Sequence, residues 1–178
     1  MNHLKPNCTG IDCPIKTLQQ TLYPIITAKW GEVEMYGRAT RNTSKVGNLP
    51  EVYDSKRRYI EVLLDSKKLG QVFFLEGSRH YNIDDGMFSA PLKVVFFLNL
   101  DKFEQSAHKD ERRDDLAQKQ AYQWIDDYFF DFDISGLEKT MSEVFTGYNI
   151  DKSLYDDMHP FHVFAITGSL MYELKNNC

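Results

Sequence analysis

The sequence lacks an apolar run long enough to cross a membrane. A spanning helix needs about 20 consecutive apolar residues, whereas the most apolar stretch, residues 91–100, is much shorter and includes Lys93. Residues 1–7 also lack the apolar segment that a signal peptide carries. We therefore expect a soluble protein that is not secreted and has no membrane partner.

Cysteine is scarce, with 3 residues in a chain of 178. Cys8 and Cys13 lie in a polar leader, and Cys178 lies at the other end of the sequence. An odd number of cysteines is not a disulfide framework, and Cys8-x4-Cys13 with only His3 nearby lacks a second ligand pair for structural zinc. We expect three free thiols.

Positive charge is in deficit. The chain has 21 Lys and Arg against 26 Asp and Glu, which gives a formal net charge of -5 at pH 7. Because a protein that neutralises many phosphates usually carries an excess of Lys and Arg, this balance argues against a general nucleic-acid binder. A local basic patch is still compatible with it.

Motifs that specify a reaction are missing from the sequence. It has no glycine-rich phosphate loop, no nucleophile elbow and no cysteine set beside a plausible base. Residues 82–86 have the composition of a calcium loop, but they lack its repeating ligand positions and its terminal Glu. These residues predict a turn.

One cluster, residues 156–162, could carry chemistry, because Asp157, His159 and His162 could supply metal ligands. The spacing His159-x2-His162 on an extended segment differs from the i,i+4 placement on a zincin helix. We expect structural histidines, no cofactor and no enzyme. A metal-dependent enzyme that uses Asp157, His159 and His162 is the alternative.

Hydrophobic residues make up 42% of the chain and aromatic residues 13%, which is enough for one domain with a substantial core. Residues 91–100 are dense in β-branched and aromatic side chains and predict a strand covered on both faces, at the centre of a sheet. Residues 162–172 predict a second long strand. Their alternation makes one face, with Phe164 and Ile166, more apolar than the other.

Three helices are predicted. Apolar residues recur at helical spacing over residues 15–30, in a helix interrupted or bent near Pro24. A charge run opens a second helix over residues 108–128, which carries an apolar stripe. Ser135–Glu138 fits a capping box, and residues 137–145 predict a short third helix.

Residues 59–64 and 71–76 predict a hairpin, which with residues 91–100 forms an antiparallel meander. The pattern indicates an α+β fold with an antiparallel sheet of four or more strands and helices packed mainly on one face. Residues 1–14 are expected to form an irregular N-terminal arm, and residues 15–178 a single α+β domain.

Residues 31–58 are polar and rich in turn formers, and they predict a long projecting loop. Its tip is positive on a chain that is otherwise negative, because Arg38, Arg41 and Lys45 lie in a stretch without acidic residues. The loop is either a docking surface for an acidic partner or a solvated linker. We take Arg38, Arg41 and Lys45 as candidate partner contacts.

Four stretches carry a resemblance in element order and texture: Leu22–Pro24, Gly47–Tyr53, Val94–Lys102 and Asp157–Phe164. In them the chain resembles small neck and tail proteins of tailed bacteriophages, of the tail-terminator and ring-forming head-tail connector kind. The nearest likeness is to phages of Bacteroidota, including the crAss-like group. The likeness extends over roughly residues 18–173.

The resemblance implies a structural virion protein with no catalytic residues, assembled in the bacterial host cytoplasm. Its copies would form a homo-oligomeric ring that joins the portal or head to the tail and contacts other neck and tail proteins. DNA would pass through the lumen without specific binding, and an acidic chain suits a conduit that does not grip phosphates. A cytoplasmic binding module is a further alternative.

Overall fold

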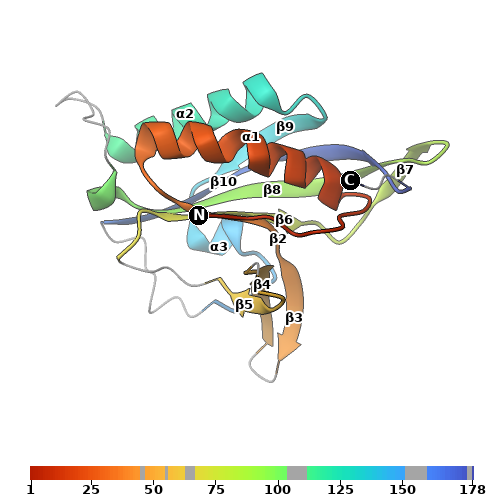
Figure 1. The fold of residues 1–178 in the computed structure, drawn as a ribbon, viewed down its shortest axis with the longest axis horizontal. Coiled ribbons are helices and arrows are strands. Elements are labelled where there is room, and N and C mark those ends of the chain that lie inside the picture. The colour runs from red at the N-terminus through yellow and green to blue at the C-terminus, as the bar shows by residue number, and fades with distance from the viewer. Residues whose placement is uncertain (45–46, 55, 63–66, 104–111, 151–159, 176–177) are drawn as a thin grey trace.

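A long β-sheet runs through the molecule and is covered on both faces (Figure 1). Two long helices lie on one face, and a short helix and a second, smaller sheet lie on the other. The computed structural model describes residues 1–44, 47–54, 56–62, 67–103, 112–150, 160–175 and 178. Its elements are β1 (Asn2–His3), α1 (Asp12–Trp30), β2 (Glu34–Arg38), β3 (Thr40–Ser44), β4 (Gly47–Tyr53), β5 (Tyr59–Glu61), β6 (Gly70–Glu76), β7 (Tyr81–Asp84), β8 (Met87–Asn99), a 3-10 turn (Leu100–Lys102), α2 (Arg113–Tyr128), β9 (Phe132–Glu138), α3 (Met141–Val144) and β10 (Phe161–Glu173).

The main sheet has the strand order β1-β2-β6-β8-β10-β9, and β7 pairs with the first residues of β8, Met87–Ser89. β8 is antiparallel to both of its long neighbours, β6 and β10, and Val94 and Val95 at its middle are fully buried. The predictions of a buried central strand and of a long closing strand are therefore confirmed. The strand at residues 71–76 also pairs with β8 as expected.

The sheet is mixed, so the prediction of an antiparallel sheet is wrong in part. β2 runs parallel to β1 and to β6, with Asn2 opposite Met35 and Met35 opposite Val72. β1 and β2 are joined by a crossover that contains α1, and β2 and β6 by a longer crossover that contains β3, β4 and β5. Each crossover returns the chain in its original direction, so the two strands that it joins are parallel.

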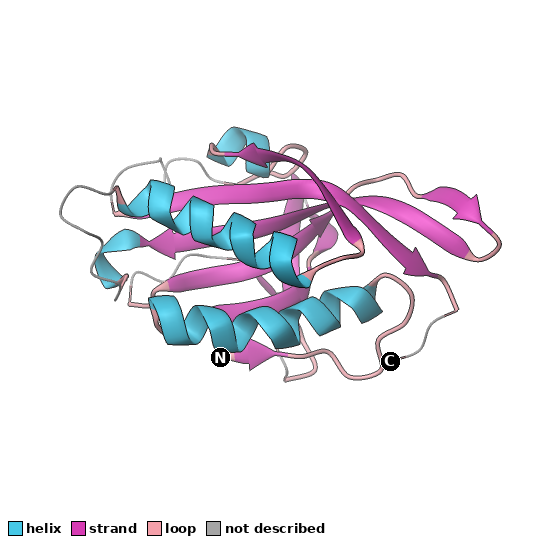
Figure 2. Ribbon diagram, turned by 90° about the horizontal axis from the view of Figure 1, so that it is seen from above, coloured by secondary structure: helices cyan, strands magenta, loops and turns pink. Residues whose placement is uncertain are grey.

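The helices α1 and α2 lie side by side over one face of the sheet (Figure 2). The prediction was a helix interrupted or bent near Pro24, and α1 continues without interruption through Pro24, which is exposed. The helix ends as predicted before Gly31. There φ is 105°, a conformation that favours glycine, and the Gly31 amide donates to the Thr27 carbonyl at 3.3 Å.

Aromatic side chains join both helices to the sheet. Trp30 at the end of α1 lies 4.9 Å from Trp124 of α2 and 5.9 Å from Phe96 of β8, measured between ring centroids. Its indole N–H donates to Gln120 of α2 at 2.6 Å, so the buried ring has its polar group satisfied. Phe96 stacks in turn on Phe164 of β10 at 4.8 Å. This cluster fixes the position of both helices over the strands.

The closing strand was predicted to have one face more apolar than the other, but both of its sides lie in hydrophobic cores. Phe164 and Ile166 belong to the core beneath the helices, whereas Val163 and Ala165 belong to a second core on the opposite face. The second core is smaller, and it is covered by α3 and the small sheet. The two long helices therefore lie on one face of the sheet, as predicted, but the other face is also buried.

Residues 31–58, predicted as a projecting loop, contribute β2, β3 and β4. The small antiparallel sheet has the order β3-β4-β5. Its strands are polar because only one side is buried: along β4, Pro50 and Val52 are buried while Glu51 and Tyr53 are partly exposed. One-sided burial leaves a weak alternation signal, which turn-forming residues hide.

Two further local predictions are wrong. Tyr59–Glu61 pairs with β4 of the small sheet and not with residues 71–76. Ser135–Glu138 lies in strand β9, which pairs with β10, and the capping box stands at Thr140 and Glu143, where it opens α3. Pairing with a long neighbouring strand overrides the local helix signal of Ser135–Glu138.

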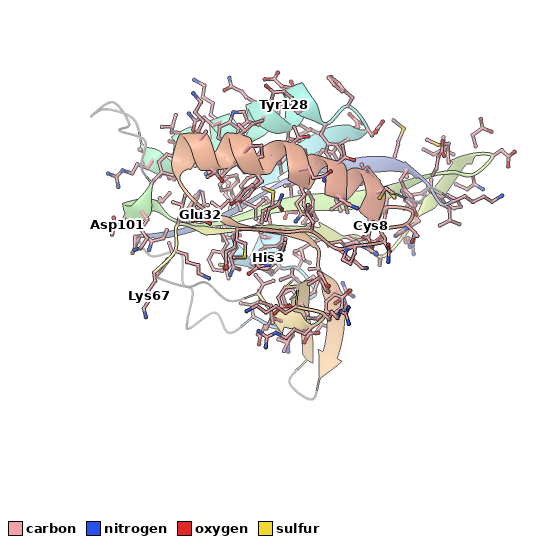
Figure 3. All side chains as sticks on the ribbon, in the orientation of Figure 1. His3, Cys8, Glu32, Lys67, Asp101 and Tyr128 are labelled. Carbon is pink, nitrogen blue, oxygen red and sulfur yellow. The ribbon has the colours of Figure 1, made fainter. Side chains whose placement is uncertain are left out.

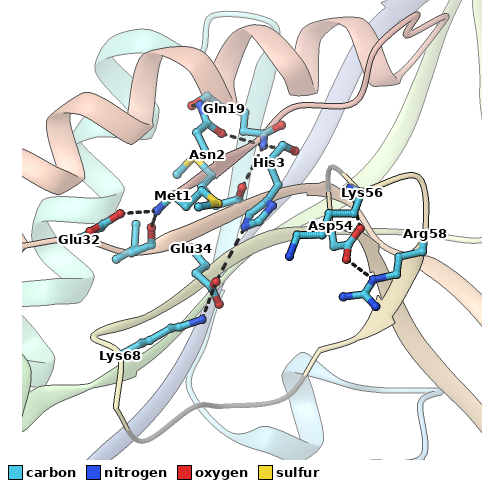
Figure 4. A network of polar contacts seen from close by, with 12 residues as sticks. Met1, Asn2, His3, Gln19, Glu32, Glu34, Asp54, Lys56, Arg58 and Lys68 are labelled. Atoms are coloured by element: carbon cyan, nitrogen blue, oxygen red, sulfur yellow. Dashed lines mark hydrogen bonds and ion pairs between the residues drawn. The ribbon is translucent and has the colours of Figure 1, made fainter.

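Residues 1–14 include regular structure, where an irregular arm was expected. β1 pairs with β2, and the ring of His3 stacks on Tyr36 at 4.4 Å. The side chain of Gln19 in α1 donates to Asn2 Oδ1 and to the carbonyls of His3 and Met35, at 2.9 to 3.1 Å (Figure 4). These contacts hold β1 between α1 and the sheet. No helix within the described ranges is long and apolar enough to span a bilayer.

Candidate interaction surface

Arg38 is the first predicted partner contact, and it lies inside an ion-pair network. Its Nε donates to Asp12 Oδ1 of α1 at 2.7 Å, and its Nη1 donates to Glu76 of β6. Burial opposes the charge, but the hydrogen bonds with Asp12 and the charge of Glu76 outweigh it and raise the pKa of Arg38. Arg38 therefore links α1 to the sheet, and its guanidinium is engaged within the chain.

The network continues to the base of the hairpin formed by β7 and β8. Glu76 Oε1 lies 2.9 Å from His80 Nε2, and His80 Nδ1 lies 2.5 Å from the hydroxyl of Tyr172 on β10. Burial and the charge of Glu76 raise the pKa of Tyr172, so the hydroxyl is neutral at physiological pH. The chain of contacts fixes the residue just before β7 to two strands of the sheet.

Arg41, the second predicted partner contact, belongs to the small sheet. Arg41 lies exposed in β3, with its guanidinium carbon 5.1 Å from the ring centroid of Tyr148, a cation–π geometry. Lys45 lies outside the described residues. The structure thus separates Arg38, which is internal, from Arg41, which faces solvent.

The alternative metal site is described only at His162. This residue lies on β10, and its Nε2 accepts a hydrogen bond from the Gln118 side chain of α2 at 2.9 Å. Asp157 and His159 lie outside the described residues. Among the residues that the structure describes, no group of three or more His, Cys, Asp and Glu side chains could hold a metal ion.

A hollow of about 700 Å³ lies at one end of the sheet, lined by residues that include Glu32, Lys67 and Asp101 (Figure 3). On its wall, Lys68 Nζ lies 2.7 Å from Glu34 Oε1 (Figure 4). Burial alone would raise the pKa of Glu34. The hydrogen bond and the charge of Lys68 outweigh burial and lower the pKa below its usual value, so the carboxyl stays ionised. The lining carries charges of both signs and does not favour one class of ligand.

The turn between β4 and β5 presents three exposed cations, Lys56, Arg57 and Arg58. The buried carboxylate of Asp54 holds it from within: it accepts from the Lys56 amide at 2.9 Å and from Arg58 Nε, while the Asp54 amide donates to the Arg58 carbonyl at 3.1 Å (Figure 4). Burial opposes ionisation of Asp54, but these hydrogen bonds lower its pKa below the usual range. We call Lys56–Arg58 the basic turn.

The backbone of the basic turn is constrained. Arg57 has φ of 62°, a left-handed conformation that costs a non-glycine residue about 1 kcal/mol or more. Such a conformation persists where surrounding contacts determine it, and the bonds to Asp54 supply them. The contacts with Asp54 thus hold three exposed cations in one turn. The basic turn was not predicted from the sequence, where positive charge was expected around Arg41. The available signal was the Lys-Arg-Arg run that begins two residues after Asp54.

The turn between β7 and β8 carries the opposite charge. Asp84 and Asp85 are exposed, the Asp85 amide donates to Asp84 Oδ1 at 2.8 Å, and Gly86 has φ of 84°. Tyr81 and Ile83 beside them are 56% and 55% exposed, which is high for large apolar side chains. The turn predicted at residues 82–86 is confirmed only for Asp85 and Gly86, because residues 82–84 belong to β7. We call Asp84–Asp85 the acidic turn.

The two charged turns lie apart on the molecule. The β7–β8 hairpin extends beyond the end of the main sheet. The small sheet, which carries the basic turn, lies on the face of the main sheet opposite α1 and α2 (Figure 1). One chain therefore presents an acidic surface with exposed apolar side chains and, on another side, a basic surface. Both are suited to contacts with other macromolecules. Comparison with protein-family models and with curated proteins finds no match to this chain.

Proposed function

We propose that this chain is a structural virion protein of a tailed bacteriophage. Its copies form a ring in the neck or tail, which joins the portal or head to the tail and surrounds the DNA channel. The observation that carries the proposal is the pair of exposed, oppositely charged turns on separate sides of one chain. The resemblance over Val94–Lys102 and the closing strand supplies the phage context.

The pair of turns supports a head-to-tail contact between copies. When two different surfaces of one chain are complementary, each copy binds the next through the same pair, and a fitting rotation closes the series into a ring. Here the acidic turn of one copy would meet the basic turn of the next. Complementary charge sets the register and speeds the encounter, while exposed Tyr81 and Ile83 supply apolar area for affinity.

The contacts that hold the basic turn and the base of the β7–β8 hairpin also favour assembly. A surface that is already ordered loses little conformational entropy on binding. The basic turn is held by Asp54, and the base of the β7–β8 hairpin is held by the contacts of His80 with Glu76 and Tyr172. Buried cores on both faces of the main sheet make the body between the turns a fixed spacer. A fixed spacer gives every copy the same rotation.

The overall charge suits a ring around DNA. With a net charge of -5, the chain repels the phosphate backbone at long range. DNA that must move through a ring benefits from weak contacts with its wall. The cations of the basic turn are then used between copies and not on the nucleic acid.

Charge reversal tests the proposed contact. The variants Asp84→Lys/Asp85→Lys and Lys56→Asp/Arg57→Asp each carry two surfaces of like charge, so each should stay monomeric in light scattering while the wild type forms oligomers. Mixing the two variants, or combining all four changes in one chain, restores opposite charges at every contact and should restore assembly.

The control is Asp84→Asn/Asp85→Asn, which keeps a side-chain acceptor at the turn and removes only the charge; it should weaken assembly without abolishing it. Electron microscopy of the wild-type oligomer should show closed rings. A wild type that stays monomeric at the highest concentration reached, or variants that do not rescue one another, would overturn the head-to-tail ring.

A further inference from the structure

The three cysteines of the chain, far apart in sequence, meet at one point in space. They gather around the carbonyl oxygen of Cys8, at the start of α1 and beyond the end of β10. The Cys178 amide donates to this oxygen at 3.2 Å. The thiols of Cys13 and Cys178 lie 3.6 and 3.7 Å from the same atom. Two thiols are therefore directed at one acceptor from opposite ends of the chain.

The three thiols differ in their surroundings. Cys13, in the first turn of α1, is 4% exposed, whereas Cys178 is exposed. Burial, followed by a hydrogen bond with the Cys178 thiol, raises the pKa of Cys13 to about 12. The Cys8 thiol donates elsewhere, to the Lys5 carbonyl at 3.1 Å. Cys13 and Cys178 are thus joined by a side-chain hydrogen bond, whereas the Cys8 thiol is used on the Lys5 carbonyl.

A hollow of about 450 Å³ lies beside the pair, lined by Cys13, Cys178, Tyr128, Phe130 and other residues. A small molecule can reach the sulfur of Cys178 through it. Its volume lies in the lower range of small-molecule pockets, which is enough for a short peptide disulfide such as oxidised glutathione to approach. Solvent exposure leaves Cys178 as the thiol that reacts first, because the thiolate is the nucleophile and burial suppresses it at Cys13.

We propose that Cys13 and Cys178 form a reversible disulfide that fastens the end of the described chain to the start of α1. The oxidant is a low-molecular-weight disulfide. The Cys178 thiolate attacks one sulfur of the reagent, its S–S bond breaks, and one reagent thiolate leaves. Cys13 then gives its proton to water and attacks the Cys178 sulfur, and the second reagent thiolate leaves. Two protein thiols are oxidised, and one reagent disulfide is reduced to two thiols.

The crosslink would fix the segment that follows β10 next to the acidic turn. The amide of Leu174 in this segment donates to the Gly86 carbonyl at 3.3 Å, so the segment already touches the turn between β7 and β8. A bond between residues 13 and 178 encloses nearly the whole chain, and long loops give the largest reduction in unfolded-state entropy. Oxidation should therefore raise the melting temperature, by roughly 5–10 °C.

The test treats the purified full chain with oxidised glutathione and then maps its peptides without reduction. The wild type should lose two hydrogen atoms in mass and yield a single crosslinked peptide that joins Cys13 and Cys178. Cys8→Ser is the matched control, because it removes a thiol of the same cluster and should leave the crosslink and the melting shift intact. Cys178→Ser, at an exposed site, should abolish both.

Two results would overturn the proposal: a chain that stops at glutathione bound to Cys178, or a crosslink that involves Cys8. Reduced dithiothreitol should reverse the shift in melting temperature within the same sample. The crosslink lies within one chain and is measured on monomers or oligomers alike. Its outcome is therefore independent of the ring.

Discussion

The two faces of the main sheet are buried by different means. On the helix face, α1 and α2 pack over the larger core, with Trp30, Phe96 and Phe164 in direct contact. On the small-sheet face, α3 and the strands β3, β4 and β5 cover a smaller core around Phe73 and Phe145. The basic turn belongs to the second face. The difference teaches that both faces are stabilised by buried cores, and that the face with the smaller core also carries the exposed basic turn.

The largest expected effect compares the two cores. Trp30→Ala should lower the free energy of unfolding by about 4 kcal/mol, because it empties the contact between both helices and the sheet. Phe145→Ala, in the smaller core near the surface, should cost about 3 kcal/mol, since its surroundings can collapse more completely. Urea denaturation of both variants measures the difference. A greater loss for Phe145→Ala would reverse our ranking of the faces.

A comparison of two glycines follows. A methyl group at Gly168 of β10 would lie 2.4 Å from the Asp133 carbonyl oxygen and 2.6 Å from the Phe132 ring, so Gly168→Ala should cost about 2–3 kcal/mol. At Gly86, in the acidic turn, a methyl group meets no described atom within 4 Å, and only the φ of 84° opposes it. Gly86→Ala should cost about 1 kcal/mol. Equal losses by thermal melting would argue against the close approach of β9 and β10.

Two arginines that sequence analysis grouped together should differ. Arg38→Met leaves the carboxylates of Asp12 and Glu76 partly buried without their shared cation, and should cost about 2 kcal/mol after allowance for solvent screening. Arg41→Met removes an exposed cation–π contact with Tyr148 and should cost about 0.5 kcal/mol. Denaturant midpoints of the two variants decide the matter. Similar values would place Arg38 at the surface after all.

Alkaline pH should weaken the fold through groups on both faces. Burial and the charge of Glu34 raise the pKa of Tyr36, and burial with the Cys178 hydrogen bond raises the pKa of Cys13 to about 12. The folded chain holds these protons more tightly, so the stability they confer is complete below the unfolded pKa values, near 9 for Cys and 10 for Tyr. It is lost as pH rises beyond them.

The urea midpoint should therefore fall between pH 8.5 and about 10.5. Tyr36→Phe has no hydroxyl to ionise, and its midpoint should fall less steeply over the same interval. Parallel slopes for the variant and the wild type would show that Tyr36 contributes nothing to the loss. The measurement is made under reducing conditions, so that the thiols stay free.

The smallest expected effect on stability is at the basic turn. Lys56→Asp/Arg57→Asp changes two exposed side chains, and aspartate tolerates the left-handed conformation of Arg57, so the free energy of unfolding should change by about 0.5 kcal/mol or less. Its effect belongs to assembly. A large loss of stability would mean that the basic turn serves the fold and would remove the contrast between the two faces.

The sequence by itself determined the long elements. Residues 91–100 are mostly apolar, and the side chains of the closing strand alternate between its two faces. The helices α1 and α2 carry apolar residues at helical spacing. These patterns record burial, which each residue reports locally, and they persist over many residues. The turn at Asp85 and Gly86 was also readable, since Asp and Gly favour turns through their own backbone preferences, but the strand over residues 82–84 was not.

Only the tertiary structure decided which segments pair. The small sheet arises from residues 40–61 because Val52 finds a core that includes Phe73 and Phe145, far along the chain. Likewise, Arg38 became internal through Asp12 and Glu76, which no local pattern joins to it.

The cysteine cluster and the two charged turns follow the same logic. Cys8, Cys13 and Cys178 meet only because α1 and the end of β10 reach the same end of the sheet. A sequence records what each residue needs, burial or solvent, at its own position. Which residue becomes its neighbour depends on how segments distant in sequence pack together, and the free energy of the whole folded chain determines that packing.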